Sequence, residues 1–488
     1  MRAEAPVFTP APEWPTDGQV QRLEQLPGPK GLPLLGNLLE LDPQRLHVVL
    51  ENWASQHGSL YAFRAGPKRT VVVGDPALSE QILRARPDDY RRIDRIERVL
   101  SELNIPGVFS AEGAAWRPQR RLMMQALNGR RITTFYPSLR RIVERLQRRW
   151  QRAAESGAVV DVLEEFKRFT VDVTTLLAFG HDVNTIEHDE DALQHHLQVI
   201  LPAINRRLTA AVPYWRVVRM PADRRTDRCI RELRARMKEL IIAARQRLDA
   251  DPERRQAPTN LLEALLTETD ETGKPFSDEV LLGNAVQILV AGEDTTAATL
   301  AWTVHVLCEH PDAVAALRDE LGQVLGEHAI PTDVDMAGRL TQVDAVVQET
   351  LRLRSVSPLV FLESNKDVVL NGVAVPRGTW IIVLTRHAAL SASHFESPLE
   401  FLPQRWLERT RAARDVSQRA SIPFGAGTRV CPGRSLAMLE MRAALAMLYT
   451  SFDVERVGRA ERVDERYAFI VEPVALEVKL RPRVRSTA

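Results

Sequence analysis

A short stretch near the C-terminus, residues 424–433, constrains this chain more than any other feature. It reads Phe-Gly-Ala-Gly-Thr-Arg-Val-Cys-Pro-Gly, so that Cys431 follows an aromatic ring and an arginine in a loop punctuated by glycines. The next residues, 434–448, are apolar and favour a helix. A helix N-terminus beside the sulfur favours the thiolate through its positive dipole and its free N–H groups. Such a cysteine can lie beneath a flat cofactor, whereas the common fate of an isolated cysteine is a buried structural position.

The loop resembles the haem-binding loop of the cytochromes P450, whose pattern is Phe-Gly-x-Gly-x-Arg-x-Cys-x-Gly, and every fixed position is filled here. The resemblance implies that Cys431 is the axial ligand of the iron of haem b, where a thiolate pushes electron density onto the metal and favours O–O cleavage. It also implies that Arg429 pairs with a haem propionate and that Phe424 shields the sulfur. The glycines, Gly425 and Gly433 among them, let the backbone approach the cofactor closely.

A second pattern interrupts a long, largely apolar helical segment at residues 291–296, which read Ala-Gly-Glu-Asp-Thr-Thr. Glycine, acid and hydroxyl residues are unfavourable in such a helix interior, and a local conflict of this kind often marks a functional site. The pattern resembles the acid–alcohol pair of the same family. Such a pair suits the activation of dioxygen, which needs an acid and a hydroxyl within hydrogen-bond reach of the oxygen. The resemblance assigns proton delivery to Asp294, hydrogen bonding of the activated oxygen and a water to Thr295, and a place beside the haem to Ala291. Taken alone, the pattern also fits a helix kink with a surface-facing acid.

Two weaker helical patterns support this assignment. Trp116 and Arg120 lie one turn apart, and the family uses both side chains on a haem propionate, although a surface arginine with a packed tryptophan gives the same spacing. Glu349 and Arg352 form an i, i+3 pair, which is a common helix salt bridge. In the family this pair is locked by a downstream arginine, here Arg405, and the role is structural rather than catalytic.

One departure from the family is visible after the Glu349 helix. Many relatives carry there another arginine that binds a propionate. The corresponding residues 358–364 read Pro-Leu-Val-Phe-Leu-Glu-Ser and contain no arginine near Leu362. Propionate binding is therefore expected to depend more on Arg120 and Arg429.

Composition bears on the partners and the compartment. The chain has 488 residues, a net charge of +1 and three widely spaced cysteines without a metal-ligand pattern. A balanced charge gives no reason to expect a nucleic-acid partner, and unpaired cysteines fit a reducing cytosol. Residues 1–26 contain charges and prolines and cannot form an apolar span of about 20 residues. We therefore expect no integral membrane segment and a soluble, cytoplasmic protein of the bacterial type.

The resemblance implies a mainly α-helical fold with small β-sheets. Residues 1–26 are expected to form a flexible arm, and residues 27–488 a single cytochrome P450 domain. Hydrophobic periodicity predicts helices over residues 132–154, 231–248 and 277–309, and alternation predicts strands over residues 70–73, 467–471 and 476–480.

The implied reaction is insertion of one oxygen atom from O₂ into a hydrophobic small molecule by hydroxylation or epoxidation. Electrons are expected from NAD(P)H through a separate ferredoxin or flavodoxin and its reductase, and a monomer is the default state. By resemblance, the pocket is lined by residues 91–113, the helix near Ala291, residues 356–361 and residues 469–471. A non-catalytic haem-thiolate sensor and a peroxygenase or isomerase of the same fold are the alternatives. A basic patch that would steer an acidic redox partner is predicted at Arg117, Arg121, Arg130, Arg131 and Arg434.

Overall fold

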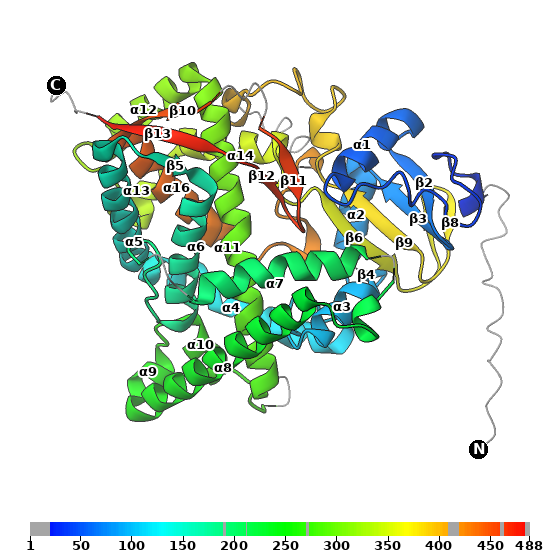
Figure 1. Cartoon of the computed structure of the whole chain (residues 1–488), viewed down its shortest axis with the longest axis horizontal. Coiled ribbons are helices and arrows are strands. Elements are labelled where there is room, and N and C mark those ends of the chain that lie inside the picture. Colours follow the sequence, from blue (N-terminus) through cyan, green and yellow to red (C-terminus); the bar gives the residue numbers. More distant parts are fainter. Residues whose placement is uncertain are drawn as a thin grey trace.

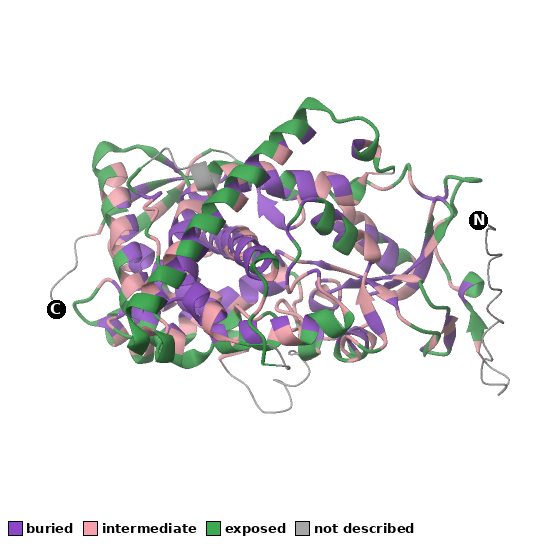
Figure 2. Ribbon diagram, turned by 90° about the horizontal axis from the view of Figure 1, so that it is seen from below, coloured by how far each residue is buried: buried purple, intermediate pink, exposed green. Residues whose placement is uncertain are grey.

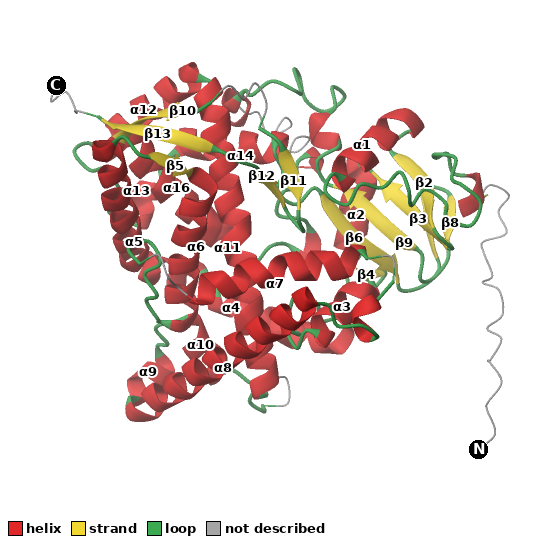
Figure 3. Cartoon of the chain, viewed as in Figure 1, coloured by secondary structure: helices red, strands yellow, loops and turns green. Residues whose placement is uncertain are grey.

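Helices fill most of the molecule, and the largest sheet lies at one end of it (Figures 1 and 3). The computed structural model describes residues 20–188, 192–210, 212–269, 273–407, 419–458 and 463–483. The prediction of a mainly helical fold with small sheets is confirmed. The described α-helices are α1 (Leu46–His57), α2 (Pro76–Arg84), α3 (Asp94–Glu102), α4 (Trp116–Ala126), α5 (Gly129–Ser156), α6 (Val162–Phe179), α7 (Ala192–Thr209), α8 (Pro221–Ala250), α9 (Pro252–Gln256), α10 (Leu261–Thr267), α11 (Asp278–Glu309), α12 (Pro311–Leu325), α13 (Val334–Gly338), α14 (Thr341–Leu353) and α16 (Arg434–Ser451).

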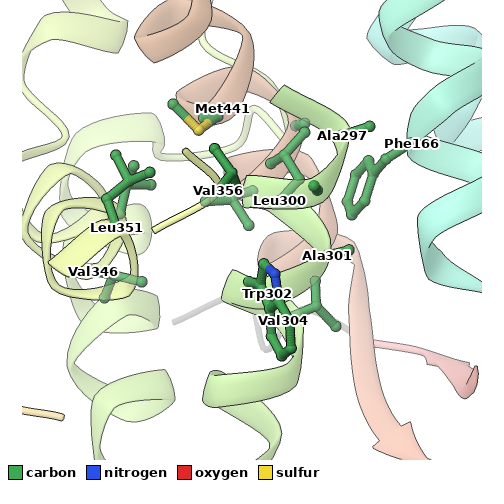
Figure 4. Packing of buried hydrophobic residues seen from close by; sticks show 14 of the residues in the cluster. Phe166, Ala297, Leu300, Ala301, Trp302, Val304, Val346, Leu351, Val356 and Met441 are labelled. Carbon is green, nitrogen blue, oxygen red and sulfur yellow. The ribbon is translucent and has the colours of Figure 1, made fainter. Parts of the chain in front are cut away.

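Helix α11 is the central element of the fold (Figure 1). It begins where the Ser277 hydroxyl caps the N–H of Val280 at 3.4 Å, and it ends before Pro311, which starts the next helix. The predicted helix over residues 277–309 is thereby confirmed. Buried residues concentrate in the interior, while exposed residues lie on the outer helices (Figure 2). Apolar side chains of α11 pack against α6, α14 and α16, as Figure 4 shows for Phe166, Leu300, Ala301, Trp302, Leu351 and Met441.

Gly292 determines how closely α6 and α11 can approach. A Cβ atom at this position would lie 2.8 Å from the Thr174 hydroxyl oxygen, which is closer than side chains tolerate. A larger residue would therefore push the two helices apart. The close approach brings the polar turn of α11, residues 291–296, next to the side chains of α6.

The sheets lie around this helical body. In the five-stranded sheet the order is β2-β3-β9-β6-β4, and only β3 and β9 run parallel. Smaller sheets have the orders β1-β8-β7, β10-β13-β5 and β11-β12. The strands are β1 (Gln21–Arg22), β2 (Leu60–Ala65), β3 (Lys68–Val73), β4 (Tyr90–Arg92), β5 (Val159–Asp161), β6 (Leu359–Ser364), β7 (Val368–Leu370), β8 (Val373–Val375), β9 (Trp380–Leu384), β10 (Phe452–Arg456), β11 (Glu465–Tyr467), β12 (Val471–Pro473) and β13 (Glu477–Pro482).

The strand predicted over residues 467–471 is wrong. The chain reverses there, so that β11 and β12 form an antiparallel hairpin around residues 468–470. Phe469 has a φ of +79°, a left-handed conformation that bulky residues seldom adopt. Apolar alternation cannot reveal this reversal, because the turn contains neither glycine nor proline.

The N-terminal region is in part integrated into the fold. Strand β1 pairs in parallel with β8, and a 3-10 helix (Leu23–Gln25) follows it. Residues 20–26 of the predicted arm therefore lie on the body, while residues 1–19 fall outside the described residues. Within the described residues, no helix is both long and apolar enough to span a membrane.

Candidate active site

The cysteine loop is closed by its own backbone. The N–H of Cys431 donates to the carbonyl oxygen of Phe424 at 2.9 Å, and Gly425 supports the turn with a φ of +73°. Helix α16 begins directly after Gly433, as the sequence predicted. The guanidinium of Arg434 lies 5.5 Å from the centre of the Phe424 ring. The loop therefore presents the cysteine at a helix N-terminus with an aromatic ring nearby.

Cys431 is accessible yet closely surrounded by protein. Desolvation raises the pKa of its thiol, and the backbone N–H groups of Gly433 and Arg434, with the charges of Arg120 and Arg434, oppose that rise. These groups stabilise a negative sulfur. A metal ion bound by the sulfur would complete the deprotonation, because a coordinating thiol loses its proton.

Two patterns that lie about 300 residues apart in the sequence meet at this loop. Arg120 on α4 donates to the carbonyl oxygen of Val430 at 2.6 Å. The guanidinium of Arg429 lies 4.0 Å from the centre of the Trp116 ring, and burial lowers the pKa of Arg429 to about 10. The structure thus brings together Trp116, Arg120, Arg429 and Cys431.

A cluster of arginines next to this contact carries more positive than negative charge. The carboxylate of Glu112 accepts from Arg429 at 2.6 Å and lies 3.8 Å from Arg86. Nevertheless Nε of Arg429, and Nε and Nη2 of Arg86, are buried without a hydrogen-bond partner among the described residues. Arg92 adds a third cation to the cluster. Unsatisfied buried guanidinium nitrogens fit a ligand that brings carboxylates, as haem b does with its two propionates.

On the polar turn of α11, an exposed patch of the helix at Ala291, which we call the open face, lies one turn from the hydroxyl of Thr295. Ala291 is exposed although most of this helix is buried, and Thr295 is half-buried one turn later. The Thr295 hydroxyl donates to the carbonyl oxygen of Ala291 at 2.8 Å. The hydroxyl lies where a ligand in contact with Ala291 could reach it.

Asp294 points to helix α6 rather than to solvent. Its carboxylate lies 3.7 Å from the ammonium of Lys167, which also lies 3.4 Å from Glu472 and 3.6 Å from Glu164. Burial raises the pKa of Asp294 to about 6, and the charge of Lys167 opposes the shift. The Glu164 side chain is 43% exposed, so this group of charges links Asp294 to solvent. The sequence pattern did not predict Lys167, because its partner lies on another helix.

Glu293, the neighbouring acid, is fully buried, and desolvation holds the pKa of its carboxyl well above its usual range. Oε2 of this carboxyl has no hydrogen-bond partner among the described residues. The backbone carbonyl of Glu293 accepts from the Thr170 hydroxyl at 3.0 Å. Glu293 therefore lies at the contact between α6 and α11, near Asp294 and Lys167.

Two buried amides, which the sequence analysis missed, fasten residues 105–110 to α11. The side chain of Asn284 accepts from the N–H of Val108 at 2.9 Å, and that of Gln287 accepts from the N–H of Phe109 at 2.8 Å. Gly283 permits the contact, since a Cβ there would lie 1.5 Å from the carbonyl oxygen of Pro106. The signal was present in the sequence, because Asn284, Gln287 and Ala291 share one face of the helix.

The fastened loop brings two of the predicted pocket segments together. The rings of Phe109 and Phe469 lie 5.9 Å apart in an edge-to-face arrangement. Phe469 occupies the strained turn of the β11–β12 hairpin, and such strain often accompanies a functional role. Phe361 on β6 packs at the border of the two large apolar clusters of the core.

The hydrogen-bonded ion pairs of Glu349 form a buried network, in agreement with the structural role predicted for Glu349, Arg352 and Arg405. Both carboxylate oxygens of Glu349 accept from Arg352, at 2.8 and 2.9 Å. Arg405 and Trp406, which lie in the 3-10 helix η5 (Pro403–Trp406), also donate to this carboxylate, at 2.9 and 2.7 Å. The network holds the segment that precedes the cysteine loop against α14.

Comparison with known proteins agrees with this geometry. The family model described as Cytochrome P450 matches residues 26–480. The chain is 24% identical over 438 residues to the protein LUTEIN DEFICIENT 5, chloroplastic, of Arabidopsis thaliana, over 88% of this chain and 72% of that protein. It is 25% identical over 445 residues to the carotene epsilon-monooxygenase of the same plant, over 88% and 81%. A bifunctional cytochrome P450/NADPH–P450 reductase of Alternaria alternata is 27% identical over 467 residues, which cover 92% of this chain but only 40% of that protein.

Proposed function

Because the chain belongs to the cytochrome P450 family of haem-thiolate monooxygenases, we propose that it oxidises a hydrophobic small molecule and that Cys431 provides the thiolate ligand. The observation that carries the proposal is the meeting of Trp116 and Arg120 with the loop that holds Arg429 and Cys431. Both patterns contribute positive charge where haem carboxylates need it, and the loop contributes the sulfur.

The residues of the loop and of α4 then have separate tasks. When bound, the haem supplies the oxygen chemistry, which the cysteine thiolate assists by pushing electron density onto iron. Trp116, Arg120 and Arg429 hold the carboxylates, and Phe424 covers the sulfur. The N-terminus of α16 stabilises the thiolate through its N–H groups.

Proton supply is the proposed task of the polar turn of α11. Asp294, with a pKa of about 6, exchanges protons readily near neutral pH. The cluster of Lys167, Glu164 and Glu472 connects it to solvent. The Thr295 hydroxyl, which donates to the carbonyl oxygen of Ala291, is the group that would hydrogen-bond to a ligand on the open face of this helix. Such an arrangement favours a monooxygenase over the two alternatives, since neither a sensor nor a peroxygenase needs proton delivery.

The substrate class is proposed from the aromatic side chains of the predicted pocket segments. Phe109, Phe361 and Phe469 come from three segments and offer apolar surface. Apolar walls with few polar groups suit a terpenoid, steroid or fatty-acid-like molecule. The printed name of one relative, a carotene epsilon-monooxygenase, agrees with an apolar substrate.

We further propose that electrons come from NAD(P)H through a separate ferredoxin or flavodoxin and its reductase, in a cytoplasmic protein of the bacterial type. Arg117, Arg121, Arg130 and Arg434 are exposed, and Arg131 is half-buried. Arg117 is paired with Asp88 at 3.3 Å, which reduces its share of the basic patch. A fused reductase, as the name of the Alternaria alternata relative states for that protein, is the alternative electron source.

Turnover with isotopically labelled oxygen tests the proposed function. The purified protein is supplied with a ferredoxin, its reductase, NADPH, ¹⁸O₂ and apolar compounds that change the spin state of the haem. We expect a product that carries one ¹⁸O atom. Stable O₂ or CO binding without turnover of any such compound would instead show a sensor, and products formed from a hydroperoxide alone would show a peroxygenase or isomerase.

Thr295→Ala is expected to separate electron use from product formation. Without the hydroxyl, NAD(P)H consumption continues, but product per NAD(P)H falls by about tenfold or more and hydrogen peroxide accounts for the difference. The measurement is the ratio of product to cofactor oxidised. Thr296→Ala is the control, because Thr296 is buried and its ratio should stay near that of the unmodified protein. An unchanged ratio in Thr295→Ala would remove Thr295 from the mechanism.

Lys167→Gln is expected to move the pH dependence of the product ratio upward. The charge of Lys167 holds the pKa of Asp294 down against burial, so its loss raises that pKa above about 6. The midpoint of the profile should rise by about one pH unit, whichever protonation state is active. Glu293, Glu164 and Glu472 face the same site and are unchanged in this variant. Asp294→Asn should lack the transition altogether, and a midpoint that does not move in Lys167→Gln would contradict the assignment.

A further inference from the structure

Strand β4 carries an arginine beside the position at which the family's propionate arginine is missing. Strands β4 and β6 are antiparallel, and their register sets Arg92 directly opposite Leu362. Opposed residues on such strands project from the same face of the sheet, with Cβ atoms about 5 Å apart. The adjacent pair, Arg91 and Glu363, projects from the other face and is joined by an ion pair at 3.6 Å. Arg92 thus supplies a guanidinium on the face of the sheet from which Leu362 projects. An arginine at position 362 would project from the same face.

The contacts of Arg92 fix its stem and leave its charged end available. Nε donates to the carbonyl oxygen of Phe109 at 2.8 Å, and the guanidinium carbon lies 3.7 Å from the centre of the Phe109 ring. The two terminal nitrogens make no hydrogen bond within the part of the chain that the structure describes. A planar guanidinium held in this way is ready to bind a carboxylate with its outer edge.

The surroundings of Arg92 carry more positive than negative charge. Arg86 and Arg429 lie near it, and Glu112 is the carboxylate that they share. Desolvation and the charges of Arg86 and Arg429 hold the pKa of Arg92 well below its usual range. Three cations therefore surround one anion, and the two carboxylates of haem b would balance the excess.

We propose that Arg92 is a haem-binding residue, which donates hydrogen bonds to a propionate in place of the arginine that many relatives carry on the strand equivalent to β6. Glu112 holds Arg86 and Arg429 beside it, so that the carboxylate meets an ordered group of donors. The proposal rests on the haem site proposed above, and it is independent of the substrate and of the redox partner.

The rate of haem loss tests the proposal without any turnover. Ferric Arg92→Gln is mixed with excess apomyoglobin, and the transfer of haem is followed by absorption. We expect transfer about tenfold faster than from the unmodified protein, as the loss of a charge-assisted hydrogen bond predicts. The matched control is Arg91→Gln on the opposite face, which should stay within about twofold.

Reconstitution with haem dimethyl ester, whose two carboxyl groups are blocked, identifies the atoms involved. With the ester, Arg92→Gln and the unmodified protein should lose the cofactor at rates within about twofold of each other. Equal rates with natural haem, or an acceleration that persists with the ester, would overturn the proposal. Arg92→Lys, which keeps the charge but not the fork, replaces Arg92→Gln if that variant does not fold, and the same two criteria apply. An unmodified protein without thiolate-ligated haem would instead refute the proposed function.

Discussion

Cys431→Ala is expected to abolish oxygenation and to change the spectrum of the reduced CO complex. In the unmodified protein, reduction with dithionite under CO should give a strongly red-shifted Soret band, because a thiolate donates electron density to the iron. In the variant this band should disappear or be replaced by that of an ordinary haem–CO complex. Turnover should stop for the same reason, since the push that favours O–O cleavage is lost.

The other two cysteines provide matched controls for this experiment. Cys229 is buried on α8, and Cys308 lies half-buried on α11, where burial raises the pKa of its thiol to about 11. Neither thiol has the helix N-terminus that favours a charged sulfur at Cys431. Cys229→Ala and Cys308→Ala should therefore keep the red-shifted band. A red-shifted band in Cys431→Ala, or an ordinary band in the unmodified protein with stoichiometric haem, would refute thiolate ligation by Cys431.

The sequence predicted those parts of the site that a single segment encodes. Cys431 and its glycines lie within ten residues, and Ala291, Asp294 and Thr295 lie within one helical turn or slightly more. Spacing along one helix or loop fixes which side chains share a face, so a pattern can be interpreted without the fold. The long buried helix was predictable for the same reason, as was its end before Pro311.

Partners from other segments could not be predicted in this way. Lys167 reaches Asp294 only because Gly292 lets α6 approach α11, and Arg92 reaches the cluster through the β4–β6 register. Neither relation leaves a periodic signal in the sequence. The turn at Phe469 was missed because a strained residue reverses the chain without glycine or proline. The sequence alone shows that residues 358–364 contain no arginine, and the sheet register shows that Arg92 lies opposite Leu362.

Glu349→Gln is expected to have the largest effect on stability among the substitutions considered. The Glu349 carboxylate and the Arg352 guanidinium are both fully buried, and Arg405 and Trp406 also depend on this carboxylate. Removing the charge leaves Arg352 buried without its counter-ion, which costs about 3–5 kcal/mol in free energy of unfolding. The neutral backbone carbonyls of Ala389, Pro398 and Glu400, with one amide oxygen at position 349, would remain as acceptors, and none of them carries a compensating charge.

Denaturant unfolding and haem content measure this effect. The segment that Glu349 holds leads to the cysteine loop, so the variant should also retain less haem after purification. Glu455→Gln is the control, because Glu455 pairs with Arg481 at 2.6 Å while both side chains are well exposed. An exposed pair contributes at most about 1 kcal/mol. If Glu349→Gln unfolds within about 1 kcal/mol of the unmodified protein and keeps its haem, the buried network does not hold the cysteine loop in place, and the order of that loop must come from α16 and α4 alone.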